Sequence, residues 1–482
     1  MPRAFLFHPP GLRVQRSEDR CQGDVDELAA ASLRACNDLG YLAAVLRRDG
    51  FTPTVRDYPS EGGTWEAFEE DVRRLAPDVA IMGVTALTLL DDLRAYRIAK
   101  AVRPEMLTIA KGACLSACKV EALPAADLQV LDVGITGEAE WIVPEVVRAR
   151  RAGGDLSAVR GIIYWRDGAL VRTPDAPFCD DLDSLPFPAR DLMPNHLYVR
   201  PDTGAPMATV QTGRGCPSRC IFCLSPIIGG RRLRTRSPAN VVDEVEACVR
   251  DHGIRDFFFR ADTFTMNRRF VVGVCRELLR RRLDVSWVAN SRVRPLHEST
   301  LRWMKRAGCW LVALGIESGS DETLARMRKD ATTADARRAV ALCRSVGLKT
   351  LAYYVIGFPW EDRRLIEQTI RFGTSLNCDF AEVHVLSAYE PTPLWDMARE
   401  AGCLLHDSTL GTDYLTTPVV RTAHLSAADL TALRRRALRE LYLNPRHLLT
   451  MAGAMRSPTE IRNYARYGWR LIRRLMATGR RG

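Results

Sequence analysis

Short apolar runs alternate with longer amphipathic stretches over the first part of the chain. Five runs have the length of a buried strand, and the stretches between them carry apolar residues at the period of a helix. The runs lie at positions 3–7, 54–56, 79–84, 107–110 and 131–135. Strands that alternate with amphipathic helices predict an α/β domain with a doubly wound parallel sheet over residues 1–155.

The pattern changes between residues 156 and 206. Two apolar runs, 161–165 and 170–172, flank the pair Asp167-Gly168, which suits a tight turn between antiparallel strands. The stretch that follows is rich in proline and acidic residues, and proline removes a backbone donor and restricts its predecessor, so no long helix can form there. We therefore expect a hairpin and a proline-rich linker over 156–206.

Six further strand-and-helix units follow over residues 207–400. Their apolar runs lie at 208–212, 257–260, 285–289, 310–314, 350–356 and 381–386. Repeated parallel units of this kind predict a partial (β/α)6 barrel of TIM type, in which the strand ends and the loops after them carry the chemistry. Over 401–482, two capped amphipathic patterns predict a helical extension that packs over the barrel mouth.

Composition fits a multidomain globular protein. The chain has 482 residues, 46% of them hydrophobic, and its fourteen cysteines are scattered through helical and strand patterns. No N-terminal stretch has the pattern of a secretory signal, and no apolar run reaches the eighteen or so residues that span a bilayer. These features favour a soluble, cytoplasmic protein with reduced cysteines and no transmembrane segment.

The formal net charge is +11, which invites a nucleic-acid interpretation. The excess is arginine spread over many helices, with no basic stripe interleaved with aromatic residues. We therefore expect a solvated arginine-rich surface and no nucleic-acid partner. Contact of the C-terminal helices with an anionic partner or a membrane surface is the alternative.

Three cysteines follow the strand pattern at 208–212 with three and then two residues between them: Cys216, Cys220 and Cys223. Thiolates are the ligands of iron–sulfur clusters, and three of them leave one iron of a four-iron cluster open to a substrate or cofactor. A zinc knuckle or three unrelated buried thiols are the alternatives, but no second pair lies at zinc spacing. We interpret Cys114 and Cys118 as small buried apolar residues.

The CxxxCxxC spacing, with the aromatic Phe222 before its last cysteine, resembles the signature of the radical S-adenosylmethionine (SAM) superfamily. Later segments resemble that family in order: FFFRADTFTMN, WVANSRVR, LGIESGS, YYVIGFPWE, where Trp360 replaces a glycine, and AYEPTPLW, which also lacks its glycine. The resemblance implies a [4Fe–4S] cluster on the three cysteines. It implies SAM contacts from Phe222, Asp262, Thr263, Arg292, Glu317, Ser318 and Gly357.

The first domain resembles the cobalamin-binding domain that precedes many radical SAM domains, which implies cobalamin as a further cofactor. The similarity lies in HPP after the first strand and in GITGEAEWIVPEVV at the end of the domain. KGACLSAC stands where the family commonly has a Gly-Gly-Pro-His loop, and the DxHxxG motif that supplies a lower histidine ligand is absent. We expect cobalamin to bind without a protein histidine. A domain that keeps the fold and has lost the cofactor is the alternative.

The resemblance implies a radical enzyme that cleaves SAM reductively and abstracts hydrogen from a small biosynthetic metabolite. With cobalamin, C-methylation is the expected outcome; without it, dehydration, rearrangement or cyclisation takes its place. A one-electron reductant such as flavodoxin or ferredoxin is the expected partner. A plain electron-transfer iron–sulfur protein needs no SAM segments, and a non-radical cobalamin methyltransferase leaves CxxxCxxC unexplained.

Overall fold

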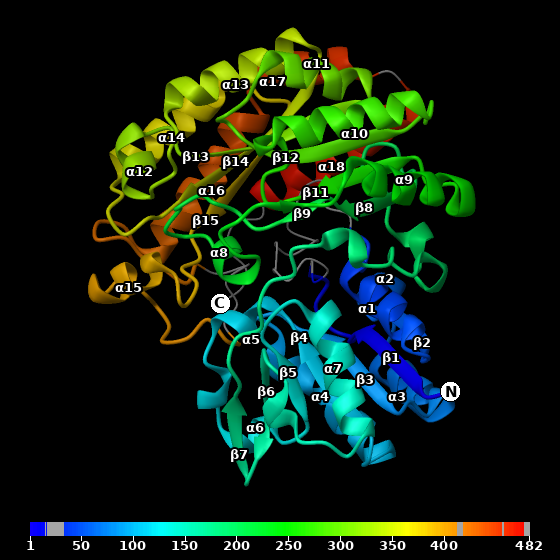
Figure 1. The fold of residues 1–482 in the computed structure, drawn as a ribbon. Coiled ribbons are helices and arrows are strands. Elements are labelled where there is room, and N and C mark those ends of the chain that lie inside the picture. Colours follow the sequence, from blue (N-terminus) through cyan, green and yellow to red (C-terminus); the bar gives the residue numbers. More distant parts are fainter. Residues whose placement is uncertain (15, 17–32, 412–417, 456, 477–482) are drawn as a thin grey trace.

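The structure, a computed structural model, describes residues 1–14, 16, 33–411, 418–455 and 457–476. Two sheets, each covered by helices, stand one above the other in Figure 1, with the N-terminal sheet in blue and cyan and the second in green to orange. The α/β class and the two-sheet architecture predicted from the sequence are confirmed. Among the described helices, none has the length and apolar character needed to cross a bilayer.

The first sheet has seven strands in the order β2-β1-β3-β4-β5-β6-β7, and β1 to β5 are parallel. Alternate residues of β1 serve two cores: Ala4 and Leu6 face one, and Phe5 and Phe7 face the other. Helices therefore cover both faces, as a doubly wound sheet requires. The parallel strands are β1 (Arg3–His8), β2 (Thr52–Asp57), β3 (Val79–Gly83), β4 (Leu107–Lys111) and β5 (Val133–Ile135). Their helices are α1 (Asn37–Arg48), α2 (Tyr58–Glu61), α3 (Trp65–Leu75), α4 (Leu89–Val102), α5 (Ala113–Ala117), α6 (Ala125–Leu128) and α7 (Ala139–Arg151).

The expected hairpin forms from β6 (Ile162–Arg166) and β7 (Ala169–Arg172), and Asp167 and Gly168 have the positive φ values of a primed turn. It is not part of a free connector, because β6 pairs antiparallel with β5 and the hairpin completes the first sheet. The proline-rich stretch after it carries Tyr198, which is buried in the first domain's core.

The second sheet has six parallel strands in the order β15-β14-β13-β12-β11-β8. Its two edge strands, β8 and β15, do not pair with each other, so the barrel is partial, as predicted. The strands are β8 (Met207–Gln211), β11 (Asp256–Arg260), β12 (Ser286–Arg292), β13 (Cys309–Glu317), β14 (Lys349–Ile356) and β15 (Phe380–Val385). The helices that follow them include α9 (Pro238–His252), α10 (Arg268–Arg280), α11 (Glu298–Arg306), α12 (Asp321–Arg326), α13 (Thr333–Ser345), α14 (Arg363–Leu376) and α15 (Pro393–Glu400).

The C-terminal helices form where the sequence predicts them, but over the described residues only the first of them reaches the carboxyl end of the barrel, where Leu430 packs on Gly357. Helix α16 (Ala427–Tyr442) begins with a capping box and runs along β15, where the Tyr442 hydroxyl donates to the Ala381 carbonyl at 2.7 Å. After α17 (Pro445–Ala454), α18 (Pro458–Met476) contacts Asp202 and Phe380, which lie at the amino ends of the strands. The prediction that this extension packs over the barrel mouth is wrong for α18, because amphipathicity shows that a helix face is covered and not which end of the barrel it lies against.

Candidate active site

The three cysteines lie on the loop that follows β8 and the short strand β9 (Gly213–Arg214); we call residues 215–224 the cysteine loop. All three are free thiols, with Cys216 buried and the other two half-buried. Three backbone hydrogen bonds anchor the loop: Cys216 N–H to Gly230 O, Ile221 N–H to Met327 O, and Leu394 N–H to Ile221 O. Its shape is therefore fixed by main-chain contacts with segments far apart in sequence.

Glycine is required at the start of the loop. Gly215 has a φ of +85°, and a Cβ there would lie 2.2 Å from the Arg232 carbonyl oxygen. No side chain fits at that distance, and the neighbouring atoms are backbone. The close approach brings the cysteine loop against the segment between α8 (Ser225–Ile228) and β10 (Arg234–Thr235).

Asp262, at the end of β11, fastens both ends of the cysteine loop. One carboxylate oxygen accepts from the Gly215 N–H at 3.0 Å and the other from the Ser225 hydroxyl at 3.0 Å. The Ser225 hydroxyl also lies 3.2 Å from the Cys223 sulfur. Asp262 thus holds the loop as a structural acceptor, and its predicted contact with SAM stays a prediction.

Arg292 and Glu317 meet around a residue that sequence reasoning missed, Lys329. The Lys329 ammonium donates to the Glu317 carboxylate at 2.6 Å, and Arg292 donates to the Lys329 carbonyl and lies 3.5 Å from the Cys220 sulfur. Burial raises the pKa of the Cys220 thiol, while the charges of Lys329 and Arg292 oppose that rise. Two cations beside this sulfur suit an anionic thiolate ligand. No sequence signal pointed to Lys329, which lies in a charged stretch after α12.

Two further predicted SAM contacts, Ser318 and Thr263, differ in whether the protein already satisfies their hydroxyl groups. Ser318 is fully buried, and its hydroxyl bonds to the Ser320 N–H and to Thr369. Thr263 is buried too, but its hydroxyl has no hydrogen-bond partner among the described residues. An unpartnered buried hydroxyl is costly in a folded protein and is often satisfied by a ligand. Of these two side chains, Thr263 has the free bonding capacity.

Gly357 and Phe222 belong to an aromatic and carboxylate cluster at the end of β14. The N–H groups of Gly357 and Phe358 both donate to Glu361, at 2.8 and 3.1 Å, and Glu361 is fully buried. Burial raises the pKa of Glu361 to about 7. Phe222 meets the Phe358 ring edge-on, with the ring centroids 6.0 Å apart. Glu361 was also missed, although the quoted GFPWE segment contains it.

A cavity separates the carboxyl ends of the two sheets. It holds about 820 Å³ of empty space, part of it open to solvent. From the first domain, the start of α1, the end of β4 and the loop after β5 contribute Asp38, Lys111 and Glu138, and the end of β11 in the second sheet contributes Arg260 and Asp262. Ligands bind at the carboxyl ends of parallel strands in both kinds of fold. The cavity thus lies where both domains offer their binding edges.

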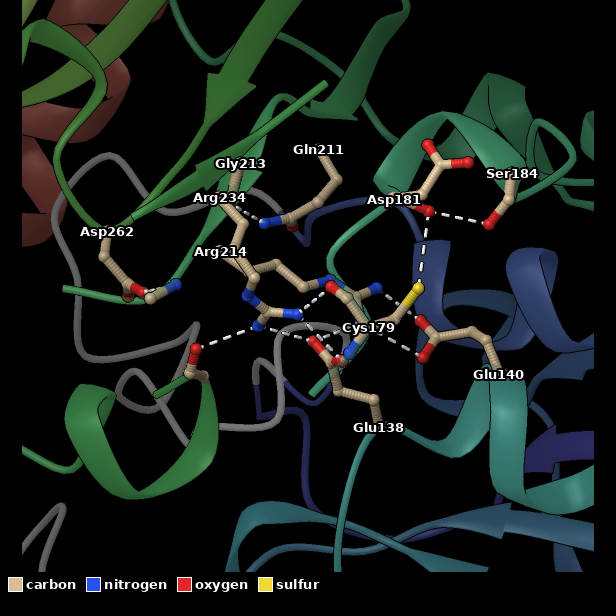
Figure 2. Close-up of polar contacts among 12 residues, drawn as sticks. Glu138, Glu140, Cys179, Asp181, Ser184, Gln211, Gly213, Arg214, Arg234 and Asp262 are labelled. Atoms are coloured by element: carbon tan, nitrogen blue, oxygen red, sulfur yellow. Dashed lines mark hydrogen bonds and ion pairs between the residues drawn. The ribbon is translucent and has the colours of Figure 1, made fainter. Parts of the chain in front are cut away.

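Ion pairs join the two domains beside the cavity. Figure 2 shows Arg214, two residues before Cys216, between the carboxylates of Glu138 and Glu140. Arg214 lies 2.6 Å from Glu140, and Arg234 donates to both oxygens of Glu138 at 2.8 and 3.0 Å. Burial would raise the pKa of Glu138, but the arginine partners outweigh it and lower that pKa. The GEAE segment is therefore clamped to the base of the cysteine loop, a contact that sequence reasoning did not foresee.

A second buried polar network closes the first-domain side of the cavity. His8 lies between two carboxylates, with Nδ1 3.2 Å from Asp57 and Nε2 3.4 Å from Asp38. The Lys111 ammonium lies 2.7 Å from Asp38, and the Tyr198 hydroxyl donates to Asp57 at 2.7 Å. Burial lowers the pKa of His8, but the two carboxylates outweigh it and raise that pKa to about 9. His8 is thus an imidazolium with both ring nitrogens engaged.

The other cysteine pair behaves as predicted. Cys114 and Cys118 are 4% and 3% exposed and pack in a core of the first domain. Among the described residues, no three His, Cys, Asp or Glu side chains converge as the ligands of a single metal ion.

Comparison with known proteins identifies the family to which this chain belongs. Residues 210–373 match the family model of the radical SAM superfamily. An uncharacterized methyltransferase of Pyrococcus horikoshii is 31% identical over 415 residues, which cover 85% of this chain and 88% of the relative. An anaerobic magnesium-protoporphyrin IX monomethyl ester cyclase of Rubrivivax gelatinosus is 28% identical over 84% of this chain and 73% of the relative.

Solved structures share the whole fold. The radical SAM methyltransferase TsrM from Kitasatospora setae matches with a TM-score of 0.70 and 19% identity, over 99% of this chain and all of that one. The cobalamin-dependent radical enzyme OxsB matches with a TM-score of 0.71 and 13% identity, over 98% of this chain and 72% of that one. The six parallel strands of the second sheet agree with the partial barrel that the repeated strand-and-helix units predict. The chain belongs to the radical SAM superfamily, as a methyltransferase-like enzyme.

Proposed function

We propose that this enzyme uses a [4Fe–4S] cluster, SAM and cobalamin to methylate a carbon of a small biosynthetic metabolite. The observation that carries the proposal is the cavity between the carboxyl ends of the two sheets. It is lined by α1 and the loops after β4 and β5 on one side, and on the other by Arg214, which precedes the cysteine loop, and by Asp262, which holds that loop. In support, TsrM has been solved with cobalamin and a [4Fe–4S] cluster, and OxsB with aqua-cobalamin and SAM.

Cys216, Cys220 and Cys223 hold the cluster in this proposal. Once bound, the cluster would supply the one electron that breaks the C–S bond of SAM to methionine and a 5′-deoxyadenosyl radical, and cobalamin would supply the methyl group. The protein holds the cysteine loop through Asp262 and Gly215 and places Arg292 beside the Cys220 sulfur. A one-electron reductant such as flavodoxin or ferredoxin is the partner that the reaction needs.

The proposed SAM contacts lie at the carboxyl ends of β11 to β14 and, for Phe222, in the cysteine loop. The unpartnered hydroxyl of Thr263 is the strongest support, because a ligand would supply the bond that the protein does not. The other proposed contacts are Phe222, Asp262, Arg292, Glu317, Ser318 and Gly357.

The first-domain side of the cavity suits cobalamin bound without a histidine ligand. His8 cannot donate a lone pair to cobalt, because both its nitrogens face carboxylates and its pKa lies near 9. At Gly112 a Cβ would lie 2.1 Å from the Val84 carbonyl oxygen, so this cavity-lining loop packs directly on β3's end. We therefore expect the base-off form.

A second function has one specific observation in its favour. Relatives that match most of this chain include anaerobic magnesium-protoporphyrin IX monomethyl ester cyclases, so the same architecture also supports chemistry other than methylation. Cyclisation, dehydration or rearrangement without cobalamin would use the same cysteine loop and leave the first domain as a structural wall.

An anaerobic turnover assay of the reconstituted enzyme, with and without cobalamin, separates the two functions. Methylation predicts S-adenosylhomocysteine and 5′-deoxyadenosine together, a base-off spectrum, and no change in that spectrum in His8→Gln. Substrate conversion by cobalamin-free protein, with 5′-deoxyadenosine and no S-adenosylhomocysteine, would assign the second function instead.

Thr263→Val tests the SAM site with a matched control. Thr300 on α11 is also buried and also has a hydroxyl without a partner among the described residues, so Thr300→Val makes the same change elsewhere. We expect Thr263→Val to weaken SAM binding roughly ten-fold, the value of one hydrogen bond to a ligand, while Thr300→Val leaves it unchanged. Equal affinity in both variants contradicts the assignment of Thr263.

A further inference from the structure

The C-terminal helices expose an unusual share of the large apolar side chains. The described residues include ten exposed large hydrophobic side chains, and five of them lie between residues 443 and 469. Leu449 is 76% exposed and Trp469 is 62% exposed. Single exposed apolar residues need no explanation, but a concentration in one short segment indicates an interaction surface.

Helix α18 contacts the barrel through Asn463 and Tyr464. The Asn463 side chain donates to the Asp202 carbonyl at 2.8 Å, and the Tyr464 ring stacks on Phe380 with the centroids 6.3 Å apart. Both contacts lie at the amino ends of the strands, at the opposite end of the barrel from the cysteine loop. A ligand on the outer side of α18 would not meet the cavity.

The outer side of α18 consists of two parallel rows. Ile461, Ala465 and Trp469 recur every four residues and are exposed, so they form an apolar row along one face. Arg462 and Arg466 are exposed one residue further on, and Arg473 continues the basic row. Residues 458–476 include five arginines, no lysine and a single carboxylate, Glu460. We call this face, residues 461–473, the α18 face.

We propose that the α18 face docks on an anionic lipid surface. An amphipathic helix with arginine on its polar side and large apolar residues beside it lies in the interface plane, with guanidinium groups on lipid phosphates and an indole at headgroup depth. Charge complementarity favours an anionic surface, and the exposed apolar row favours lipid over nucleic acid, which has no acyl layer to receive it.

Docking in this way fixes the orientation of the enzyme. The amino ends of the barrel strands would face the bilayer, and the cavity between the sheets would face away from it. The proposal does not depend on which radical reaction the enzyme performs, because the docking face and the active site share no residue.

Vesicle co-sedimentation of the full chain tests the proposal. We expect binding to phosphatidylcholine vesicles that contain phosphatidylglycerol, weak binding to phosphatidylcholine alone, and loss of binding at high salt. Each basic residue near an anionic leaflet contributes about five-fold to the binding constant, so the double variant Arg462→Glu/Arg466→Glu should lose about 30-fold or more. Trp469→Ser should weaken binding with a smaller change in salt dependence.

The chain offers a matched control. Arg435 and Arg439 on α16 are exposed and four residues apart, so Arg435→Glu/Arg439→Glu makes the same charge change on another helix. This control should retain nearly wild-type binding, and circular dichroism checks that both variants are folded. Equal loss in the two double variants would show non-specific attraction and overturn the proposal. Binding to single-stranded RNA without vesicle binding, or self-association that Trp469→Ser abolishes, would also overturn it.

Discussion

The two walls of the cavity are built by different means. On the barrel side, the cysteine loop is held by backbone hydrogen bonds and by a glycine that approaches other backbone atoms. On the first-domain side, the wall is a set of buried charges in which His8 and Lys111 face Asp38 and Asp57. The barrel-side contacts fix the position of the cysteine loop, whereas the first-domain contacts fix the charge and protonation of the buried side chains.

This difference has a physical consequence for each wall. The main-chain hydrogen bonds tolerate few substitutions and are insensitive to pH, because neither partner titrates. Two further hydrogen bonds that hold the loop end on the carboxylate of Asp262. Buried ion pairs respond to pH and to the loss of any one partner, since an uncompensated buried charge is costly. The following variants test whether the walls differ in this way.

Removal of the three cysteines should have the largest effect. Cys216→Ala/Cys220→Ala/Cys223→Ala leaves no thiolate in the loop, so we expect complete loss of the cluster's visible absorption and of SAM cleavage. Cys179→Ala is the control, since Cys179 is a half-buried free thiol outside the loop. A full four-iron cluster in the triple variant would contradict the assignment.

Gly215→Ala should abolish most cluster incorporation while leaving the first domain intact. The added methyl group would lie 2.2 Å from a backbone oxygen, and the loop must move to admit it. Gly253→Ala is the matched control: it also has positive φ, at +66°, but faces open space and should cost only about 1 kcal/mol of stability. Iron and sulfide content, measured after reconstitution, distinguishes the two variants. Normal iron and sulfide content in Gly215→Ala would contradict the requirement for glycine at this position.

Lys111→Met should lower the free energy of unfolding by about 3 kcal/mol. The substitution leaves the buried Asp38 carboxylate with one neighbouring cation, His8, instead of two. The comparison is Arg47→Met, which breaks an ion pair of the same length whose side chains are 46% and 56% exposed, and which should cost under about 1 kcal/mol. Thermal unfolding midpoints measure the difference. Equal midpoints for the two variants would mean that the buried charges contribute no more than surface ones.

The pH dependence of stability should carry a contribution from His8. Its pKa is about 9 in the folded protein against 6.5 unfolded, so the folded state binds more protons between these values. The contribution, about 3 kcal/mol at most, is complete below pH 6.5 and is lost as pH rises through 9. The groups that face His8 are Asp38 and Asp57, with Lys111 beyond Asp38. His8→Gln should flatten unfolding free energy over this range, while exposed His196→Gln should not.

The sequence predicted the functional residues on the barrel side of the cavity more completely than those on the first-domain side. CxxxCxxC and Glu317 stand out because each is a local pattern attached to one strand end. All eleven parallel strands were also anticipated, since alternation of apolar runs and amphipathic stretches is a local property. The hairpin was found, but its pairing with β5 was not, because pairing partners leave no periodic signal.

The charged contacts could not be foretold, for the same reason. Lys111 and Asp38, like Arg214 and Glu140, come from segments far apart in the chain and are brought together only by folding. A charged residue in a sequence looks the same whether it ends up in solvent or in a buried pair. The placement of α18 at the amino end of the barrel was hidden for the same reason.

The hydrogen bond from the Leu394 N–H to the Ile221 carbonyl also bears on how the enzyme is made. A ribosome releases the cysteines well before it releases Leu394 and α15, so the nascent loop has its thiols but not this part of its cover. The Met327 contact on the same loop residue is completed earlier. Cluster delivery during synthesis would therefore meet a loop that still lacks its hydrogen bond to Leu394, whereas delivery to the finished chain meets a loop already held by it.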